Sequence, residues 1–181
     1  MTRIAVVGVT GSGKTTLAQL LSQELSLPHI ELDALHWGAN WTSILTAELR
    51  PRVQAALVAV DWVVDGNYGN LRDVIWAFAD TLIWLDFPMP LIVWRLLRRT
   101  LRRIMTHENM WNANCYESWR TQFFSRESLF LYAPKSQRKH RNLYPTLFTR
   151  PEYAHLQVIR LYSPRAVDRW IWNIRDETYA E

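Results

Sequence analysis

Residues 8–16 read GVTGSGKTT and carry three of the six glycines in the chain. The stretch fits the pattern GxxxxGK[ST], in which the backbone N–H groups of a glycine-rich loop surround a phosphate. An apolar run precedes it at residues 4–7 and leucines at helical spacing follow it, which is the strand–loop–helix order that such a loop requires. The pattern predicts that a nucleoside triphosphate and Mg²⁺ bind here, through Gly8, Gly11, Ser12, Gly13, Lys14, Thr15 and Thr16.

Three residues of this loop have distinct chemical roles in the prediction. Lys14 is expected to reach the β- and γ-phosphates and to act in catalysis by stabilising the transferred group. Thr15 offers its hydroxyl to Mg²⁺, and Thr16 is placed to contact the α-phosphate. The sequence lacks the NKxD motif typical of GTPases and the LSGGQ-like motif typical of ABC-type ATPases, which leaves the small kinases as the favoured class.

Carboxylates lie at the ends of the apolar runs that are predicted to be the second, third and fourth strands. Glu31 and Asp33 end the second run, Asp65 ends the third and Asp86 ends the fourth. Because the carboxyl ends of parallel strands meet at one edge of a sheet, we expect these groups near the phosphate loop. Glu31 and Asp65 are candidates to hold Mg²⁺, and Asp33 is a candidate to orient or deprotonate an acceptor hydroxyl. A helix N-cap or a solvated turn is the alternative role for each of these four carboxylates, and it is favoured most for Asp86.

Arginines are concentrated on one predicted helix, which begins at Pro88 and Pro90 and ends near Met105. Their spacing of three or four residues puts them on one face, and no acidic residue interrupts the helix. Such a face predicts a negatively charged partner, and the arginines of a lid that closes over phosphates fit this requirement. The face consists of Arg95, Arg98, Arg99, Arg102 and Arg103, of which Arg98 and Arg102, with Arg126 from the following segment, are predicted to be catalytic.

Apolar runs alternate with helical patterns along the chain. Strands are expected at residues 4–7, 29–32, 62–64, 81–85 and 156–161, and helices at residues 14–25, 46–58, 70–77, 88–105 and 163–177. This alternation predicts an α/β, three-layer P-loop NTPase fold with a five-stranded parallel sheet. The segment of about 106–151 breaks the alternation, because it has no glycine and is rich in aromatic and basic residues. We interpret it as a helical lid insertion within a single domain of residues 1–181.

Composition limits the class of protein. The chain has 181 residues, 49% of them hydrophobic, and contains no apolar run of 18 residues, so we expect no membrane partner. A single cysteine excludes an internal disulfide and fits the cytoplasm. The five histidines lack the spacing of a zinc site. The net charge of +4 comes from arginine far more than from lysine, which favours ligands that carry phosphate.

Several blocks occur together in an order that resembles one known family. GVTGSGKTT, IELDALHW, WVVDGNY, TLIWLDFP and WRLLRRTLRR follow one another in the chain. Over about residues 1–172 the sequence resembles an adenylate-kinase-like family of P-loop kinases, often described as DNA topology modulation proteins. The resemblance implies a kinase that uses ATP and Mg²⁺ to phosphorylate a small-molecule acceptor, in the manner of nucleoside and nucleotide kinases.

The resemblance also suggests roles for individual residues. Glu31 and Asp33 resemble the acidic pair of shikimate-type kinases, in which one acid helps to hold magnesium and the next orients the acceptor hydroxyl. Asp65-Gly66 resembles the Asp-Gly of nucleotide kinases, where a nearby arginine grips the acceptor phosphate. Here Asn67-Tyr68 follows and the nearest arginine is Arg72, which argues against a nucleoside monophosphate as the acceptor. The predicted acceptor site is therefore formed by Asp33, Trp37, Asp65, Gly66, Asn67 and Arg72.

Other roles stay open at this stage. Trp37 and Trp41 flank Gly38 and could stack on a base or another flat acceptor, or they could pack together at the rim of the pocket. Ser163 and Arg165 resemble the loop that borders adenine. A nucleic-acid-binding regulator that uses ATP as a switch is the alternative function, although the modest positive charge does not favour it. A third possibility is a degenerate kinase kept as an interaction module, which the intact phosphate loop argues against.

Overall fold

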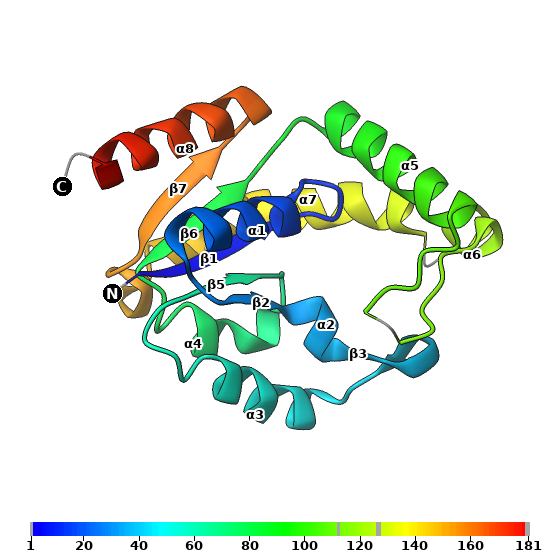
Figure 1. The fold of residues 1–181 in the computed structure, drawn as a ribbon, viewed down its shortest axis with the longest axis horizontal. Coiled ribbons are helices and arrows are strands. Elements are labelled where there is room, and N and C mark those ends of the chain that lie inside the picture. Colours follow the sequence, from blue (N-terminus) through cyan, green and yellow to red (C-terminus); the bar gives the residue numbers. More distant parts are fainter. Residues whose placement is uncertain (1, 112, 126–127, 180–181) are drawn as a thin grey trace.

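Arg3–Gly8 forms β1, the central strand of a five-stranded parallel sheet, in the computed structural model, which describes residues 2–111, 113–125 and 128–179 (Figure 1). Its side chains alternate between the two faces. Ala5 and Val7 belong to one hydrophobic cluster, and Ile4 and Val6 belong to another. A continuous apolar run is the sequence that such a doubly buried strand needs. Across the sheet, the order is β2 (His29–Glu31), β5 (Trp62–Asp65), β1, β6 (Thr81–Leu85) and β7 (Gln157–Leu161).

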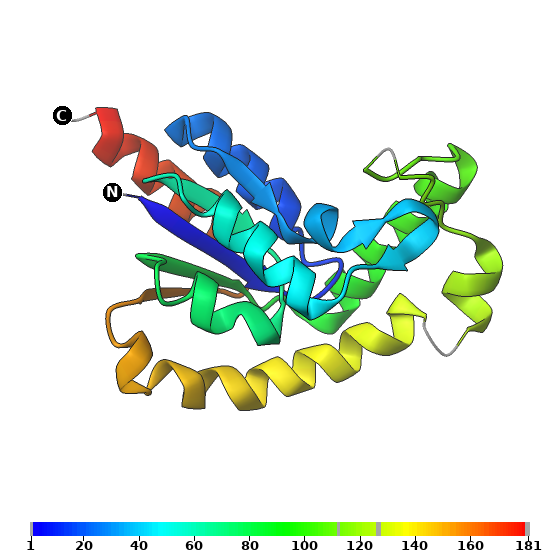
Figure 2. The ribbon, with the colours of Figure 1, turned by 90° about the horizontal axis from the view of Figure 1, so that it is seen from below.

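Helices cover both faces of this sheet (Figures 1 and 2). The face that carries Ile4 and Val6 is covered by α1 (Lys14–Leu25), α5 (Met89–Met105) and α8 (Pro164–Tyr179). The opposite face is covered by α3 (Thr46–Ala56), α4 (Arg72–Ile75) and much of α7 (Leu129–Phe148). Two apolar layers therefore enclose the sheet, which confirms the predicted three-layer α/β P-loop fold.

The predicted elements differ from the observed ones mainly near the carboxyl edge of the sheet. The second strand ends at Glu31, because Leu32 already begins the short helix α2 (Leu32–His36). The helix expected at residues 70–77 is only a 3₁₀ turn, η2 (Gly69–Leu71), followed by α4. The remaining short elements are β3 (Trp37–Gly38), η1 (Ala39–Trp41), β4 (Thr42–Ser43), α6 (Trp119–Phe124) and η3 (Pro151–Tyr153).

The segment of about 106–151 divides into two parts with different environments. Its first part is a loop at residues 106–111 and 113–118, in which Met110 and Cys115 form an isolated antiparallel bridge, followed by α6. Its second part is α7, which returns along the sheet (Figure 2) and buries Tyr144 and Leu147 in the same cluster as Trp84. Tyr144 and Phe148 of α7 therefore pack in the main core, whereas Tyr132 near the start of α7 is exposed. The loop of the first part reaches the β3–β4 hairpin (Figure 2).

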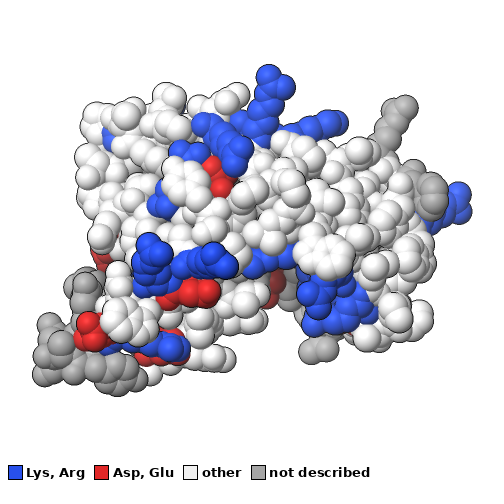
Figure 3. All heavy atoms as spheres, turned by 90° about the horizontal axis from the view of Figure 1, so that it is seen from above, with Lys and Arg blue, Asp and Glu red and all other residues white. Residues whose placement is uncertain are grey.

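On one face of the molecule the positive charge lies in separate groups (Figure 3). Figure 3 shows that Lys and Arg side chains on the face seen from above are interrupted by uncharged surface and by acidic side chains. None of the helices in the described part of the chain combines the length and the apolarity that a bilayer crossing requires.

Asp86 has a structural role, but not as the helix cap or turn that the sequence offered as its alternative. It follows β6, is only 2% exposed, and accepts hydrogen bonds from Arg141 Nε at 2.8 Å and Arg160 Nη2 at 2.5 Å. Gln137 also donates to it, and the Arg160 guanidinium stacks on Trp84 at 4.0 Å from the ring centroid. This buried carboxylate therefore ties the end of β6 to β7 and to α7.

Replacing Asp86 by alanine is expected to lower the free energy of unfolding by about 3 kcal/mol, because it leaves two arginines without their buried counter-charge. Urea unfolding monitored by circular dichroism measures the loss. The matched control is Asp73→Ala, since Asp73 also pairs with an arginine, Arg50, but lies in the open with a 62% exposed side chain. The control substitution should lower the free energy of unfolding by less than about 1 kcal/mol. Equal losses in the two variants would contradict the structural role of Asp86.

Candidate active site

The phosphate loop connects β1 to α1 and depends on glycine at its tightest points. Gly11 and Gly13 have φ angles of 79° and 93°, in the left-handed region that favours glycine. A Cβ atom on Gly11 would lie 3.0 Å from the carbonyl oxygen of Ile92 in α5. The loop is therefore packed against α5 on one side, and its backbone can curl so that its amides face inward. The first turn of α1 adds N–H groups that suit an anion.

Lys14 and Thr15 begin α1 and lie next to the predicted acidic residues. The Lys14 ammonium donates to the carbonyl oxygen of Val9 at 3.2 Å, inside the loop. Burial lowers the pKa of Lys14, and the nearby carboxylates of Asp33 and Asp65 oppose that change. The Thr15 hydroxyl donates to Asp65 Oδ2 at 2.7 Å. The structure thus brings the loop hydroxyl and the strand-end carboxylate of the predicted metal site into direct contact. Thr16 is exposed.

Asp65, Gly66 and Asn67 join the end of β5 to the start of the phosphate loop. Asp65 is 3% exposed, and its second oxygen lies 2.7 Å from His29 Nε2. Gly66 has a φ angle of 145°, and a Cβ atom there would lie 2.8 Å from Leu32 Cβ. The Asn67 amide accepts from the Gly8 N–H at 3.1 Å and also donates to the Gly8 carbonyl. Asn67 therefore uses its side chain to hold β5 to the loop, and its role toward a substrate stays a prediction.

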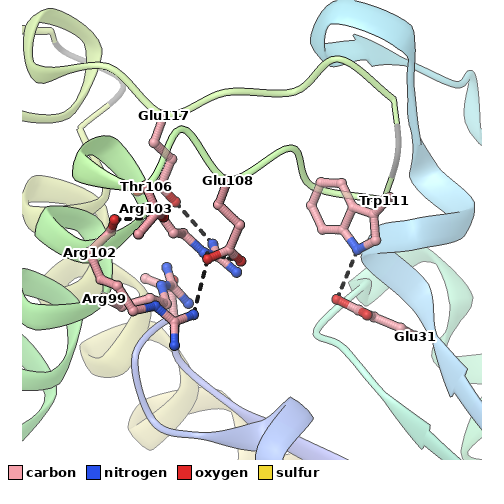
Figure 4. A network of polar contacts seen from close by, with 9 residues as sticks. Glu31, Arg99, Arg102, Arg103, Thr106, Glu108, Trp111 and Glu117 are labelled. Atoms are coloured by element: carbon pink, nitrogen blue, oxygen red, sulfur yellow. Dashed lines mark hydrogen bonds and ion pairs between the residues drawn. The ribbon is translucent and has the colours of Figure 1, made fainter.

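Glu31 and Asp33 lie on either side of the junction between β2 and α2. Glu31 accepts a hydrogen bond from Trp111 Nε1 at 3.1 Å, which links β2 to the loop at residues 106–118 (Figure 4). Burial raises the pKa of Glu31, and the Trp111 hydrogen bond opposes that change. Asp33 is exposed and accepts a hydrogen bond from the Tyr68 hydroxyl at 2.7 Å. Burial, followed by the Asp33 charge, raises the pKa of Tyr68, so this phenol remains a donor.

The arginines of α5 separate into two groups once the chain is folded. Arg95 donates to the Ser12 carbonyl oxygen at 3.1 Å, and Arg99 donates to Thr10 Oγ1 at 3.2 Å, so both contact the phosphate loop. Arg102 and Arg103 instead pair with acids that the following loop supplies, Glu108 and Glu117 (Figure 4).

Two arginines predicted to be catalytic thus lie away from the loop in this structure. The Arg98 guanidinium lies 5.9 Å from the ring centroid of the exposed Trp94, and Arg102 has a 67% exposed side chain paired with Glu108. Arg126, the third, lies outside the described residues. By contrast, Arg99 is largely buried, and burial followed by the Arg103 charge lowers its pKa. The structure does not test the catalytic role of any of these arginines, but it brings Arg95 and Arg99 closest to the phosphate loop among those of α5.

Trp37 and Trp41 belong to the β3–β4 hairpin and contact each other and the neighbouring loop. Their ring centroids lie 5.4 Å apart in an edge-to-face arrangement, and Trp41 meets Trp111 at 6.0 Å. Trp41 Nε1 donates to the Tyr116 carbonyl oxygen at 3.1 Å, and the Asn40 N–H donates to the Ala113 carbonyl oxygen at 2.9 Å. The indoles therefore join the hairpin to the loop, and stacking on an acceptor stays a prediction for Trp37.

Arg72 lies at the other side of the acceptor region. Its guanidinium faces the rings of Trp76 and Tyr144, at 5.3 and 5.8 Å from their centroids. It lines a small cavity together with Gly66 and Tyr68. Among the described residues, no carboxylate forms an ion pair with Arg72, which leaves its charge available to an anion. Arg72 is therefore the cationic residue of the predicted acceptor site, held beside Trp76 and Tyr144.

Ser163 and Arg165 lie after β7, at the start of α8. The Ser163 hydroxyl accepts a hydrogen bond from the Ala166 N–H at 3.2 Å and so caps the helix. Arg165 is exposed. The role of both residues beside adenine stays a prediction.

His140 on α7 was not predicted as a site residue, but it lies near the charged groups of the site. It is 6% exposed, it stacks on Tyr144 at 4.7 Å, and its Nδ1 has no hydrogen-bond partner within the described residues. Burial, followed by the positive charges of Arg72 and Lys14, lowers the pKa of His140 to about 4. A sequence pattern could not identify it, because it approaches Lys14 only through the packing of α7 under the sheet.

His140 should make stability depend on pH below neutrality. Between pH 6.5 and about 4 the unfolded chain binds a proton at this histidine that the folded chain does not bind, so stability falls as the pH falls through that window. The loss should reach at most about 3 kcal/mol, since one pKa unit corresponds to about 1.4 kcal/mol. Urea unfolding at pH 7, 5.5 and 4.5 measures it, and His140→Gln should show a smaller loss than the unmodified protein. Parallel pH dependence in the two proteins would exclude this effect.

The sequence analysis did not predict several residues that contact the predicted site residues. They are His29 on Asp65, Tyr68 on Asp33 and Trp111 on Glu31. Tyr68 lies inside the WVVDGNY block, so that motif could have indicated it as a site residue. His29 and Trp111 lie in no motif that the sequence analysis used. Among the described residues, no group of three His, Cys, Asp or Glu side chains could hold a metal ion without other ligands.

Comparison with known proteins addresses the fold. No protein-family model and no curated protein matches this sequence. Among solved structures, the chain is similar to a sugar kinase of a Janibacter species, with 22% identity, a TM-score of 0.51, and 94% of this chain and 93% of that chain covered. It is similar to a shikimate kinase of Acinetobacter baumannii in complex with shikimate, with 16% identity, a TM-score of 0.56, and 100% and 95% covered. A gluconokinase of Sinorhizobium meliloti 1021 has 17% identity, a TM-score of 0.50, and 98% and 95% covered. At these identities the likeness establishes the fold: the chain has the three-layer α/β fold that is found in P-loop kinases.

Proposed function

We propose that this protein is a kinase that uses ATP and Mg²⁺ to phosphorylate a hydroxyl group of a small-molecule acceptor. The observation that carries the proposal is the 2.7 Å hydrogen bond from Thr15 to Asp65, beside Lys14. It unites the hydroxyl and the carboxylate that a magnesium–triphosphate site needs at the edge of the sheet where parallel strands end. The kinases with similar folds support the reaction class, and the single domain of residues 1–181 is part of the proposal.

The residues at this edge fit a magnesium ion. Mg²⁺ prefers oxygen ligands, keeps several waters, and takes one or two carboxylates together with substrate phosphates. Thr15 would ligate it, and Asp65 and Glu31 would hold it through water. When bound, the ion neutralises the charge that develops on the phosphates.

The triphosphate would be held by backbone and side chains of the phosphate loop. The amides of Gly11 and Gly13 would face the β-phosphate, with Lys14 on the β- and γ-phosphates and Thr16 on the α-phosphate. The N–H groups of Gly8 and Ser12 donate to Asn67 Oδ1 and to the Val9 carbonyl oxygen, so their contacts with the triphosphate stay a prediction. Arg95 and Arg99 approach the same loop from α5 and add positive charge. Ser163 and Arg165 would border the adenine.

The predicted lid arginines would need to change their contacts to reach the phosphates. Arg98 would leave Trp94, and Arg102 would leave Glu108, which is a small change because both side chains are exposed. Arg126 is proposed as a third lid arginine on the sequence pattern alone. Closure of this part of the chain over bound ATP would exclude water from the transferred group.

The acceptor would lie between α2, α4 and the β3–β4 hairpin. Asp33 would orient its hydroxyl or accept its proton, and Tyr68 would hold the Asp33 carboxylate in place. Arg72 would bind an anionic group of the acceptor, because its charge has no carboxylate partner among the described residues. Trp37, together with Asp65, Gly66 and Asn67, would form the remaining wall. An acceptor that carries both a hydroxyl and a carboxylate or phosphate fits these groups best.

A nucleic-acid-binding function has no comparable support. The positive groups on the face in Figure 3 are discontinuous, whereas duplex binding needs a basic surface that follows the phosphate backbone. The arginines of α5 nearest the phosphate loop are engaged with that loop. We therefore propose a cytoplasmic enzyme of small-molecule metabolism, and membership of the family described as DNA topology modulation proteins stays a prediction.

Two measurements test the proposed function. Isothermal titration calorimetry with Mg²⁺ and a non-hydrolysable ATP analogue should show one site per chain. A coupled assay of ADP formation should then detect turnover with a panel of hydroxy acids, phosphorylated sugars, nucleosides and neutral alcohols. Absence of binding to ATP and GTP analogues would overturn the proposal. Binding without turnover, combined with tight salt-dependent DNA binding in a gel shift, would favour the regulatory alternative.

A further inference from the structure

We propose that His29 is a positioning residue for the magnesium–triphosphate site: its ring N–H holds the Asp65 carboxylate so that the other carboxylate oxygen fixes the Thr15 hydroxyl. This inference rests on the proposed function, because it concerns the same site. His29 belongs to none of the motifs that predicted the site, and it acts through Asp65 without reaching the phosphates.

The geometry is a chain of three side chains. His29 Nε2 lies 2.7 Å from Asp65 Oδ1, and Thr15 Oγ1 lies 2.7 Å from Asp65 Oδ2. An ionised carboxylate can only accept hydrogen bonds, so the imidazole must donate from Nε2 and the threonine must donate from its hydroxyl. Each oxygen of Asp65 therefore has its own donor: His29 for Oδ1 and Thr15 for Oδ2.

Strand register explains why these residues meet. β2 and β5 pair in parallel with Glu31 opposite Asp65 and His29 opposite Val63. Residues two apart on a strand share a face, so His29 and Glu31 lie on the same face as Asp65, the face that α1 covers. The side chain at residue 29 thus lies diagonally across from Asp65, within reach of a histidine. Thr15, in the first turn of α1, approaches Asp65 from above the same face.

Burial makes this arrangement restrictive. The Asp65 side chain is only 3% exposed and that of His29 is 16% exposed, so solvent can replace neither hydrogen bond easily. A carboxylate with a donor on each oxygen cannot rotate without losing a buried hydrogen bond. The Thr15 hydroxyl then continues to donate its hydrogen bond to Asp65. The lone pairs of the hydroxyl oxygen therefore stay directed toward the place where the ion and the phosphates would bind.

The experiment compares side chains that keep or remove the N–H donor. His29→Gln keeps a donor at nearly the position of Nε2 and cannot become charged, whereas His29→Leu removes the donor. Calorimetry measures the affinity for a non-hydrolysable ATP analogue, once with saturating Mg²⁺ and once with EDTA. We expect His29→Leu to lose about 10-fold in affinity with Mg²⁺ and little in EDTA, in line with the usual effect of such supporting residues. His29→Gln should remain within about 3-fold of the unmodified protein.

The outcomes separate this inference from the proposed function. If the unmodified protein shows no Mg²⁺-dependent binding of the analogue, the proposed function fails and the role of His29 fails with it. If the unmodified protein binds and His29→Leu binds equally well, only the role of His29 is overturned. Equal losses with Mg²⁺ and EDTA, or a His29→Gln variant as weak as His29→Leu, would show a general structural effect and also overturn it. Should His29→Leu fail to fold by circular dichroism, His29→Asn, whose amide is too short to reach Asp65, replaces it with the same expected results.

Discussion

Replacing Lys14 by alanine is expected to lower kcat/KM for phosphoryl transfer by about 10³-fold or more while the protein stays folded. The ammonium group donates to the Val9 carbonyl oxygen within the loop, and it is the cation that the motif directs to the β- and γ-phosphates. Removing one preorganised group that stabilises transition-state charge typically costs 10²- to 10³-fold, and the lost positive charge adds to this cost. The coupled ADP assay measures turnover with an acceptor found in the panel.

The control for this variant is Lys139→Ala on α7. Lys139 is exposed, so its loss changes the net charge by the same amount without touching the loop. We expect it to retain activity within about 2-fold and to melt close to the unmodified protein, because exposed substitutions usually change stability little. Circular dichroism checks separately that Lys14→Ala, at a partly buried position, stays folded. Turnover by Lys14→Ala that equals turnover by Lys139→Ala would contradict the proposed mechanism.

Replacing Asp33 by asparagine is expected to lower kcat by about 10²- to 10⁴-fold, the range typical of a lost general base. The substitution keeps the size of the side chain and an oxygen that can accept the hydrogen bond from Tyr68, and it removes only the negative charge. Binding of Mg²⁺ and the ATP analogue should change little, since Asp33 lies on the acceptor side. Kinetics with varied acceptor and varied ATP separate the two effects.

Tyr68→Phe is the companion variant for Asp33. It leaves the carboxylate and removes the hydroxyl that holds it, so the expected loss in kcat is about 10-fold, which corresponds to one hydrogen bond to a charged group. If Asp33→Asn lost no more activity than Tyr68→Phe, Asp33 would act in positioning alone. If Asp33→Asn weakened analogue binding as much as turnover, its place on the acceptor side would be wrong.

Local sequence patterns predicted the strands and the phosphate loop because each depends on neighbouring residues. The run before Gly8 is apolar at successive positions, as a strand buried on both faces requires, and the glycines that follow adopt backbone angles closed to other residues. The helix expected at residues 70–77 was reduced to η2 and α4, because tertiary packing places Leu71, Val74 and Trp76 in the core without a longer helix.

The roles of the α5 arginines show the limit of such patterns. Helical spacing correctly placed them along one side, but it could not show that Glu108 and Glu117 would return to Arg102 and Arg103. These acids come from the loop beyond the helix, and their approach depends on how that loop folds. The two arginines that contact the phosphate loop, Arg95 and Arg99, are therefore distinguished from their neighbours only by the packing of α5 on residues 10–12.

By itself, the sequence determined the fold class, the phosphate loop and the edge of the sheet at which the acidic residues gather, because these follow from short-range spacing and from the parallel order of strands. Only the tertiary structure decided which partner each charged side chain has: His29 for Asp65, Tyr68 for Asp33, Trp111 for Glu31, and Gln137, Arg141 and Arg160 for Asp86. The physical reason is that hydrogen bonds and ion pairs depend on distances of about 3 Å between groups that are far apart in the chain, and those distances are set by the packing of whole elements.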